Sequence, residues 1–77
     1  SLTIGSWVAE SEVADLLRET EEAHDGVAIG SYPFFREGKT GANFVIRGTD
    51  EALLEVCAEA LSTGLRAMGR EAVAGGV

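Results

Sequence analysis

A chain of 77 residues is long enough for one small domain with a modest core. A hydrophobic fraction of 45% beside 25% charged residues is typical of a folded globular protein and argues against disorder. Thirteen acidic against six basic residues give a formal net charge of −7, which disfavours nucleic acid and anionic membranes as partners.

The composition also narrows the chemistry and the compartment. Cys57 is the single cysteine, so an internal disulfide and a multi-cysteine metal site are excluded. No apolar run approaches the roughly 20 residues of a membrane helix, and the start of the chain lacks a signal-peptide pattern. We therefore expect a cytoplasmic protein without a membrane partner. Residues 1–2 resemble a cloning remnant, and we expect residues 1–77 to be a single domain excised from a longer protein.

The chain begins with an expected strand and an expected helix. Residues 3–7 are partly β-branched and end in Trp7, which predicts a strand with the tryptophan as a lid on one edge of the core. Residues 10–24 predict a helix with Ser11 as the N-cap and a stop at Asp25-Gly26. Its apolar stripe consists of Val13, Leu16, Leu17 and Thr20.

Residues 27–48 predict a β-hairpin that turns at Glu37-Gly38. This turn sets three facing pairs: Arg36 with Lys39, Ser31 with Phe44, and Ile29 with Ile46. Because strand side chains alternate between faces, the same register gathers four apolar residues on one face, Val27, Ile29, Phe44 and Ile46. The agreement between the turn and the apolar pattern predicts the register.

The second face of this hairpin is less polar than expected for a sheet that helices cover on one side only. It carries Ala28, Gly30, Tyr32, Phe34, Asn43, Val45 and Arg47. An exposed apolar patch of this kind often marks an interface. Alternatively, the aromatic side chains fold over the edge of the sheet and belong to the core of the domain. The sequence leaves both interpretations open.

A second helix follows the hairpin. Gly48-Thr49-Asp50-Glu51 predicts its start, with an N-cap and acidic residues in the first turn. The expected apolar stripe consists of Leu53, Val56, Cys57, Ala60, Leu61, Gly64, Leu65 and Met68. Gly64 costs roughly 1 kcal/mol relative to Ala, which is acceptable if the backbone approaches the sheet closely there. Gly69 is the expected stop, and residues 70–77 form either a weak last strand or a tail.

This order of elements predicts an α+β fold, a two-layer sandwich of the type βαββα(β). Two helices pack on one face of a small antiparallel sheet. With the last strand, the arrangement is the ferredoxin-like split βαβ. Without it, the domain resembles small KH-type modules.

No motif predicts catalysis, a cofactor or a metal. The segment Gly38-Lys39-Thr40-Gly41 lacks the helix that follows a phosphate-binding loop. It also lies in a strand-to-strand turn, whereas the Gly-x-x-Gly loop of a KH domain joins two helices. His24 fits the negative end of a helix dipole better than a metal site, and Cys57 lies on an apolar stripe without a nearby base. A KH-like module that binds single-stranded nucleic acid remains the alternative function.

Two stretches, residues 27–35 and 41–50, resemble the segment after the molybdopterin-binding-like (MoCF-like) domain in CinA-related, competence- and damage-inducible proteins. That family also includes the N-terminal part of eukaryotic FAD synthases. Its members show an I-G-S-Y-P hairpin and an R-G-T-D helix start, which correspond here to residues 29–33 and 47–50. The resemblance extends from about residue 8 to residue 68.

The resemblance implies an accessory domain without catalytic residues or cofactor of its own. In that family, the preceding domain binds the nucleotide or pterin-like ligand, and pyrophosphatase action on ADP-ribose or FAD belongs to the whole protein. We expect this chain to dock on that preceding domain or on a second subunit of a homo-oligomer. The expected contacts are Tyr32, Pro33 and Phe34 as apolar residues, with Arg36 and Lys39 as cations at the hairpin tip.

Overall fold

Strand alternation, turn residues and helix caps organise the chain into four strands and two helices. The computed structural model describes residues 1–77. Its elements are β1 (Leu2–Ser6), α1 (Glu10–Glu22), β2 (Ala28–Arg36), β3 (Lys39–Arg47), α2 (Glu51–Ala67) and β4 (Val73–Ala74). Neither helix is long and apolar enough to cross a membrane.

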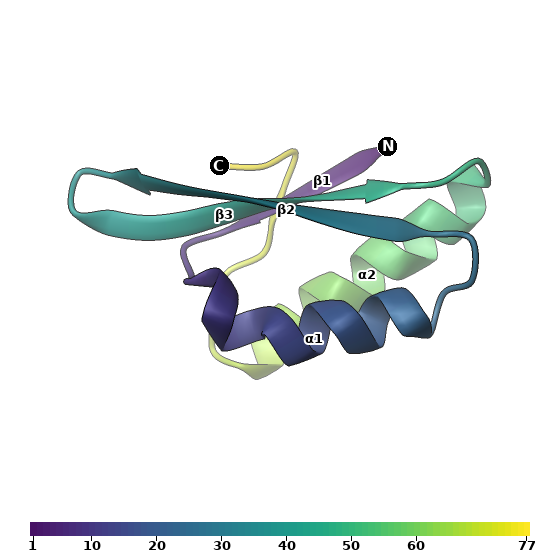
Figure 1. Cartoon of the computed structure of the whole chain (residues 1–77), viewed down its shortest axis with the longest axis horizontal. Helices are drawn as coiled ribbons and strands as arrows, with labels where there is room; N and C mark the ends of the chain where they lie inside the picture. The colour runs from purple at the N-terminus through teal and green to yellow at the C-terminus, as the bar shows by residue number, and fades with distance from the viewer.

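The sheet has the order β2-β3-β1-β4, and all neighbouring strands are antiparallel. Helix α1 connects β1 to β2, but β3 lies between these two strands, which is the split βαβ arrangement. Both helices cover the same face of the sheet (Figure 1). The predicted α+β two-layer sandwich is therefore confirmed, and of the two alternatives for residues 70–77 the structure shows a short strand, β4, followed by a tail.

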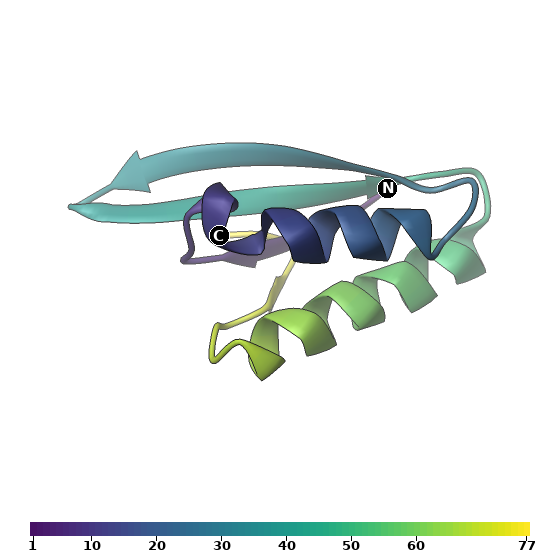
Figure 2. The same ribbon diagram turned by 60° about the horizontal axis from the view of Figure 1, so that its bottom comes forward.

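The β2–β3 hairpin has the predicted register. Arg36 pairs with Lys39, Ser31 with Phe44, and Ile29 with Ile46. The turn residues Glu37 and Gly38 have φ values of 51° and 77°, the positive values that a tight two-residue hairpin turn requires. The hairpin reaches well past the start of α1 (Figures 1 and 2).

The core lies between the sheet and the two helices. The predicted apolar face of the hairpin is confirmed, since Val27, Phe44 and Ile46 are buried and Ile29 packs against them. The buried hydrophobic residues are Ile4, Val8, Val13, Val27, Ala42, Phe44, Ile46, Leu54, Cys57, Ala58, Leu61 and Leu65. Buried core residues come from β1, α1, β3, α2 and the loops that carry Val8 and Val27, whereas β2 contributes only the partly buried Ile29.

The start of α1 differs from the prediction that Ser11 caps it. The N-cap position is Ala9, which has an extended backbone, and Ser11 lies exposed inside the first turn. The Glu12 carboxylate accepts a hydrogen bond of 3.4 Å from the Ala9 N–H. An acidic side chain at the third helical position thus orders this end without a polar N-cap side chain.

Helix α2 begins as predicted but presents a different stripe to the core. The Asp50 carboxylate accepts a hydrogen bond of 3.2 Å from the Leu53 N–H. The buried residues are Leu54, Cys57, Ala58, Leu61, Ser62 and Leu65. Three residues that were expected in the stripe are exposed: Ala60, and Val56 and Met68 with exposed fractions of 57% and 44%. Compared with the prediction, the helix is rotated about its axis. The small residues Cys57, Ala58 and Ser62 therefore face the neighbouring elements, where they allow close packing.

The end of the chain crosses from one side of the sheet to the other. Gly69 ends α2 with a φ of +78°, as predicted, and β4 pairs with Ile4 and Gly5 of β1. Gly75 and Gly76 also have positive φ values, 88° and 97°. Through them the last residues turn onto the face that the helices leave uncovered (Figure 1).

Candidate functional site

The face of the sheet turned away from both helices, here called the open face, is the candidate site. Alternation along the paired strands places there the side chains, or the bare backbone, of Thr3, Gly5, Ala28, Gly30, Tyr32, Phe34, Arg36, Lys39, Gly41, Asn43, Val45 and Arg47. No helix covers this face (Figure 1). Its chemistry is aromatic, cationic and rich in glycine.

Two aromatic rings lie together over β3 near the hairpin tip. The rings of Trp7 and Phe34 have centroids 5.3 Å apart and planes inclined by 82°, an edge-to-face pair. Both lie on Gly41, where an added Cβ atom would come within 2.5 Å of the Phe34 ring and 3.1 Å of Trp7. The glycine therefore lets both rings approach the backbone of the sheet closely.

Two cations lie over these rings, and together the four side chains form what we call the tip cluster: Trp7, Phe34, Arg36 and Lys39. The Arg36 guanidinium carbon is 4.4 Å from the Phe34 centroid and 5.5 Å from that of Trp7. The Lys39 ammonium is 5.7 Å from the Trp7 centroid. Each exposed cation–π contact contributes about 0.5–1 kcal/mol. These contacts restrict the positions of the Arg36 and Lys39 side chains, which would otherwise move freely in solvent.

A second aromatic–cation pair lies on the other side of the open face. The Arg47 guanidinium donates a hydrogen bond of 2.9 Å to the Tyr32 hydroxyl and lies 5.8 Å from the ring centroid. The Tyr32 ring lies over Gly30, where a Cβ would meet it at 3.1 Å. Tyr32 remains 48% exposed. The pair is thus ordered and still accessible.

The last residues of the chain lie across the middle of this face. The Asn43 side-chain amide donates to the Val77 carbonyl at 3.0 Å, and its oxygen accepts from the Val77 N–H at 2.8 Å. A Cβ on Gly5 would overlap the Val77 backbone, so the glycine makes room for this crossing. Val77 also lines a hollow with Trp7 and Arg36. The tail therefore borders the tip cluster.

The structure brings most of the predicted contact residues together. Four of the five lie on the open face: Tyr32, Phe34, Arg36 and Lys39. Pro33 does not, because it pairs with Ala42, whose side chain is in the core, and therefore lies on the helix side of the sheet. Sequence reasoning missed Trp7, which was expected as a lid on the core. Its position beyond β1, in phase with Thr3 and Gly5, was the available signal.

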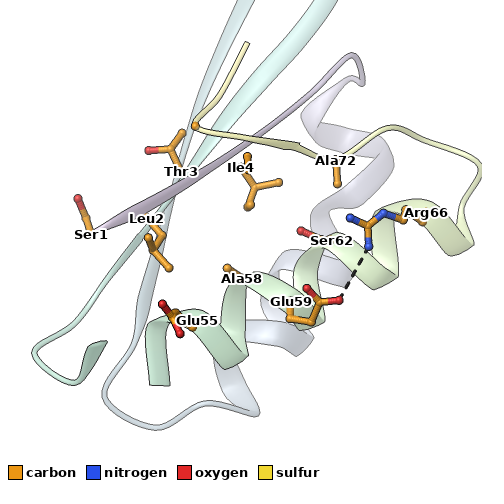
Figure 3. A pocket seen from close by; sticks show the side chains of 12 residues that line it. Ser1, Leu2, Thr3, Ile4, Glu55, Ala58, Glu59, Ser62, Arg66 and Ala72 are labelled. Atoms are coloured by element: carbon orange, nitrogen blue, oxygen red, sulfur yellow. Dashed lines mark ion pairs between the residues drawn. The ribbon is translucent and has the colours of Figure 1, made fainter. Parts of the chain in front are cut away.

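A second hollow lies outside the open face, at the β4 edge of the sheet (Figure 3). It has a volume of about 510 Å³ and runs between β1, α2 and the segment around β4. Leu2, Ile4, Ala58 and Ala72 contribute apolar surface to it, and Arg66 forms an ion pair with Glu59 at 3.9 Å. Its side chains include neither a cysteine nor a histidine, so it offers no such nucleophile or base.

His24 and Cys57, the two other side chains that could react, both lie in environments that indicate a structural role. The His24 Nδ1 lies 2.6 Å from the Thr20 carbonyl near the end of α1, as its expected structural role requires. Cys57 is buried in the core. Burial raises the pKa of its thiol, and the negative charge of Glu21 adds to that rise, so the thiol is not activated as a nucleophile. The structure contains no cluster of three or more potential metal ligands.

Comparison with known proteins places these features in a family. The family model described as FAD synthase, middle domain, matches residues 1–72. No curated protein and no solved structure matches the chain. The match agrees with the FAD synthase part of the sequence resemblance, whereas the CinA and molybdopterin parts have no support from these comparisons.

Proposed function

The chain belongs to the family of FAD synthase middle domains, and from this premise we propose that it is a non-catalytic accessory domain that docks through its open face. The partner is a neighbouring domain of the same polypeptide. The description of the family as a middle domain supports this proposal, because a middle domain stands beside other parts of its enzyme. Chemistry on the flavin nucleotide then belongs to the whole protein.

The observation that carries the proposal is an aromatic sheet face without a helical cover. Tyr32 is 48% exposed, and the Trp7–Phe34 pair lies on the same face. An antiparallel sheet can leave one face in solvent, but that face is then usually polar. Accessible aromatic side chains held in fixed positions are typical anchors of protein interfaces.

The partner we propose is the nucleotide-binding domain that precedes this segment in the proteins the sequence resembles, with a second subunit as the other outcome. The state of the single cysteine agrees with a non-catalytic role. Cys57 is buried and the pKa of its thiol is raised, so it is not activated as a nucleophile.

The proposal is tested by titrating this chain against the preceding domain of its parent protein, with and without ADP-ribose and FAD. We expect saturable binding that Tyr32→Ala and Phe34→Ala each weaken by about tenfold, the effect of losing an interface anchor. Val56→Ala is the matched control, because Val56 is an exposed apolar residue on α2 rather than on the open face.

Circular dichroism and urea unfolding separate the two interpretations of the aromatic residues. If both alanine variants keep the wild-type unfolding midpoint and lose binding, the open face is an interface. If they unfold the domain, the aromatic side chains belong to its core and the proposal is wrong. Equal binding by all variants would also overturn it.

A KH-like role in nucleic-acid binding is not proposed as a second function. Gly38 lies in the hairpin turn and Gly41 lies within β3, so the Gly-x-x-Gly letters do not join two helices. The family match provides no support for a nucleic-acid ligand.

A further inference from the structure

The six cationic side chains divide into two groups according to the face on which they lie. Arg18, Arg66 and Arg70 belong to or follow the helices, and each lies within 4.0 Å of a carboxylate. The other three, Arg36, Lys39 and Arg47, lie on the open face, and none has a carboxylate within that distance. The open face is therefore positive on a domain whose net charge is −7.

The acidic residues follow the opposite distribution. None of the thirteen acidic side chains is among the residues of the open face. Glu37 and Glu71 border hollows beside Trp7, but neither forms an ion pair with Arg36 or Lys39. The positive charge of the open face is thus left for a partner to neutralise.

The cations of the open face are held in place by aromatic rings rather than by acids. The Arg36 guanidinium lies on the Phe34 ring and near Trp7, and Lys39 also lies near Trp7. Such stacking leaves the N–H groups of a guanidinium free for two parallel hydrogen bonds to a carboxylate or phosphate. The Arg36 guanidinium also covers one face of the Phe34 ring, on which a nucleotide base could otherwise stack.

The separation of the cations distinguishes a large partner from a small one. Lys39 and Arg47 stand at the two ends of β3, eight residues apart. At the rise of a β-strand their Cα atoms are roughly 26 Å apart, and the charged groups lie closer together, because Arg47 reaches the Tyr32 hydroxyl and Lys39 lies near Trp7. A single phosphate or carboxylate reaches one end only. A nucleic acid strand spans that distance, but it is negative along its whole length and so also faces the acidic remainder of the domain, whereas a protein surface can place carboxylates opposite the three cations alone.

We infer that the open face binds a protein surface that carries Asp or Glu side chains at two separate places. One group of carboxylates pairs with Arg36 and Lys39, the other pairs with Arg47, and apolar surface between them contacts Tyr32 and Val45. This inference rests on the proposed docking function and adds the chemistry of the partner. It predicts that docking is electrostatically steered and sensitive to salt.

The test uses the same two-component titration at 50 and 500 mM NaCl. The open-face variants are Arg36→Gln with Lys39→Gln, and Arg47→Gln alone. We expect each to weaken binding at low salt by about tenfold and to flatten the salt dependence. Arg18→Gln and Arg66→Gln are the matched controls, because they remove the same charge from the helix side, and we expect changes below about twofold.

The outcomes separate this inference from the proposed function. If Tyr32→Ala abolishes binding while the Gln variants bind normally at both salt concentrations, docking stands and an acidic partner surface is excluded. If no variant and no wild-type chain binds, both proposals fall.

Two further ligands test whether the open face binds negative charge from a source other than a protein. Inorganic phosphate and a single-stranded oligonucleotide are each added to the wild-type chain and followed by amide chemical shifts. We expect no saturable shift on β2 or β3 at concentrations up to about 1 mM, so that any dissociation constant is weaker than millimolar. Saturable binding of either ligand to these strands would contradict the inference that the partner of the open face is a protein surface.

Discussion

A Cβ atom on Gly64 would overlap the side chain of Leu16, so α1 and α2 approach each other at a residue that has no side chain. The sequence suggested a close approach at Gly64 but placed it against the sheet. The structure instead assigns it to the contact between the two helices, which explains why glycine stands inside α2 despite its low helix propensity.

Replacing Gly64 by alanine should therefore destabilise the domain. Alanine gains about 1 kcal/mol in helix propensity, but overpacking against Leu16 costs roughly 1–3 kcal/mol. We expect a net loss of about 1 kcal/mol in the free energy of unfolding, measured by urea denaturation. Thr63→Ala, an exposed neighbour in the same helix, should instead be neutral or slightly stabilising.

A double-mutant cycle tests the cause of this loss. In a Leu16→Ala background the overlap disappears, so Gly64→Ala should there be stabilising. Additive effects of the two substitutions would show that the contact between Leu16 and Gly64 does not limit the approach of the helices.

Asn43 should control the order of Val77, the last residue of the chain. Its side chain makes both hydrogen bonds to Val77, and Asn43→Ala removes them. We expect amide relaxation to show a mobile Val77, while Gly75 and Gly76 keep their backbone hydrogen bonds to Thr3 and Val73, and a stability loss of about 0.5–1.5 kcal/mol. Ser31→Ala, which removes a hydrogen bond to Glu10 on the helix side, should leave the tail ordered. An unchanged tail in Asn43→Ala would contradict this role.

Ser6 offers a substitution that should raise stability. Its hydroxyl is fully buried and has no hydrogen-bond partner. An unsatisfied buried polar group is costly, so Ser6→Ala should increase the free energy of unfolding by about 1 kcal/mol. The measurement is a shift of the urea midpoint at an unchanged slope. A lower midpoint would mean that the hydroxyl has a partner in solution.

Cys57 predicts a specific dependence of stability on pH. Burial, with a smaller effect of Glu21, raises the pKa of its thiol in the folded state, so the folded protein holds that proton more tightly than the unfolded chain. Stability from this group is complete below the unfolded pKa of about 8.5 and falls as pH rises above it. Urea unfolding between pH 7 and pH 10 should show this decline.

Cys57→Ala provides the control for that experiment, because it removes the titrating thiol and should reduce the slope above pH 8.5. Native Cys57 should also react slowly with iodoacetamide and rapidly in denaturant. Fast alkylation of the folded protein would contradict the buried, protonated thiol.

The hairpin was the most predictable part of the fold. Two local signals, the turn at Glu37-Gly38 and the alternation from Ile29 to Ile46, agree on one register, and a slip by a single residue would turn the apolar face to solvent. The Asp50 cap and the Gly69 stop are likewise local, since each depends on backbone groups within a few residues.

The features that sequence reasoning missed depend on distant contacts. The face that α2 buries is set by its packing on α1 and the sheet, so Ala58 and Ser62 are buried while Val56 is exposed. Trp7 lies on the open face because it packs there against the Phe34 ring and the backbone of Gly41. The tail reaches the same face because Gly5 leaves room for it. None of these partners is a neighbour in sequence.

On the helix side, the hairpin that reaches past α1 is packed at one end only. Helix α1 begins beside Ser31, whose hydroxyl donates to Glu10, and farther along β2 the helix side is bare, with Phe35 70% exposed. Strand pairs lacking a packed face open most readily, so amide hydrogen exchange should become faster from Ile29 towards the turn. The tip cluster therefore sits on the part of the ladder that frays first. A partner that grips the tip would arrest this fraying, and the slowing of exchange there would report its binding without any label on the partner.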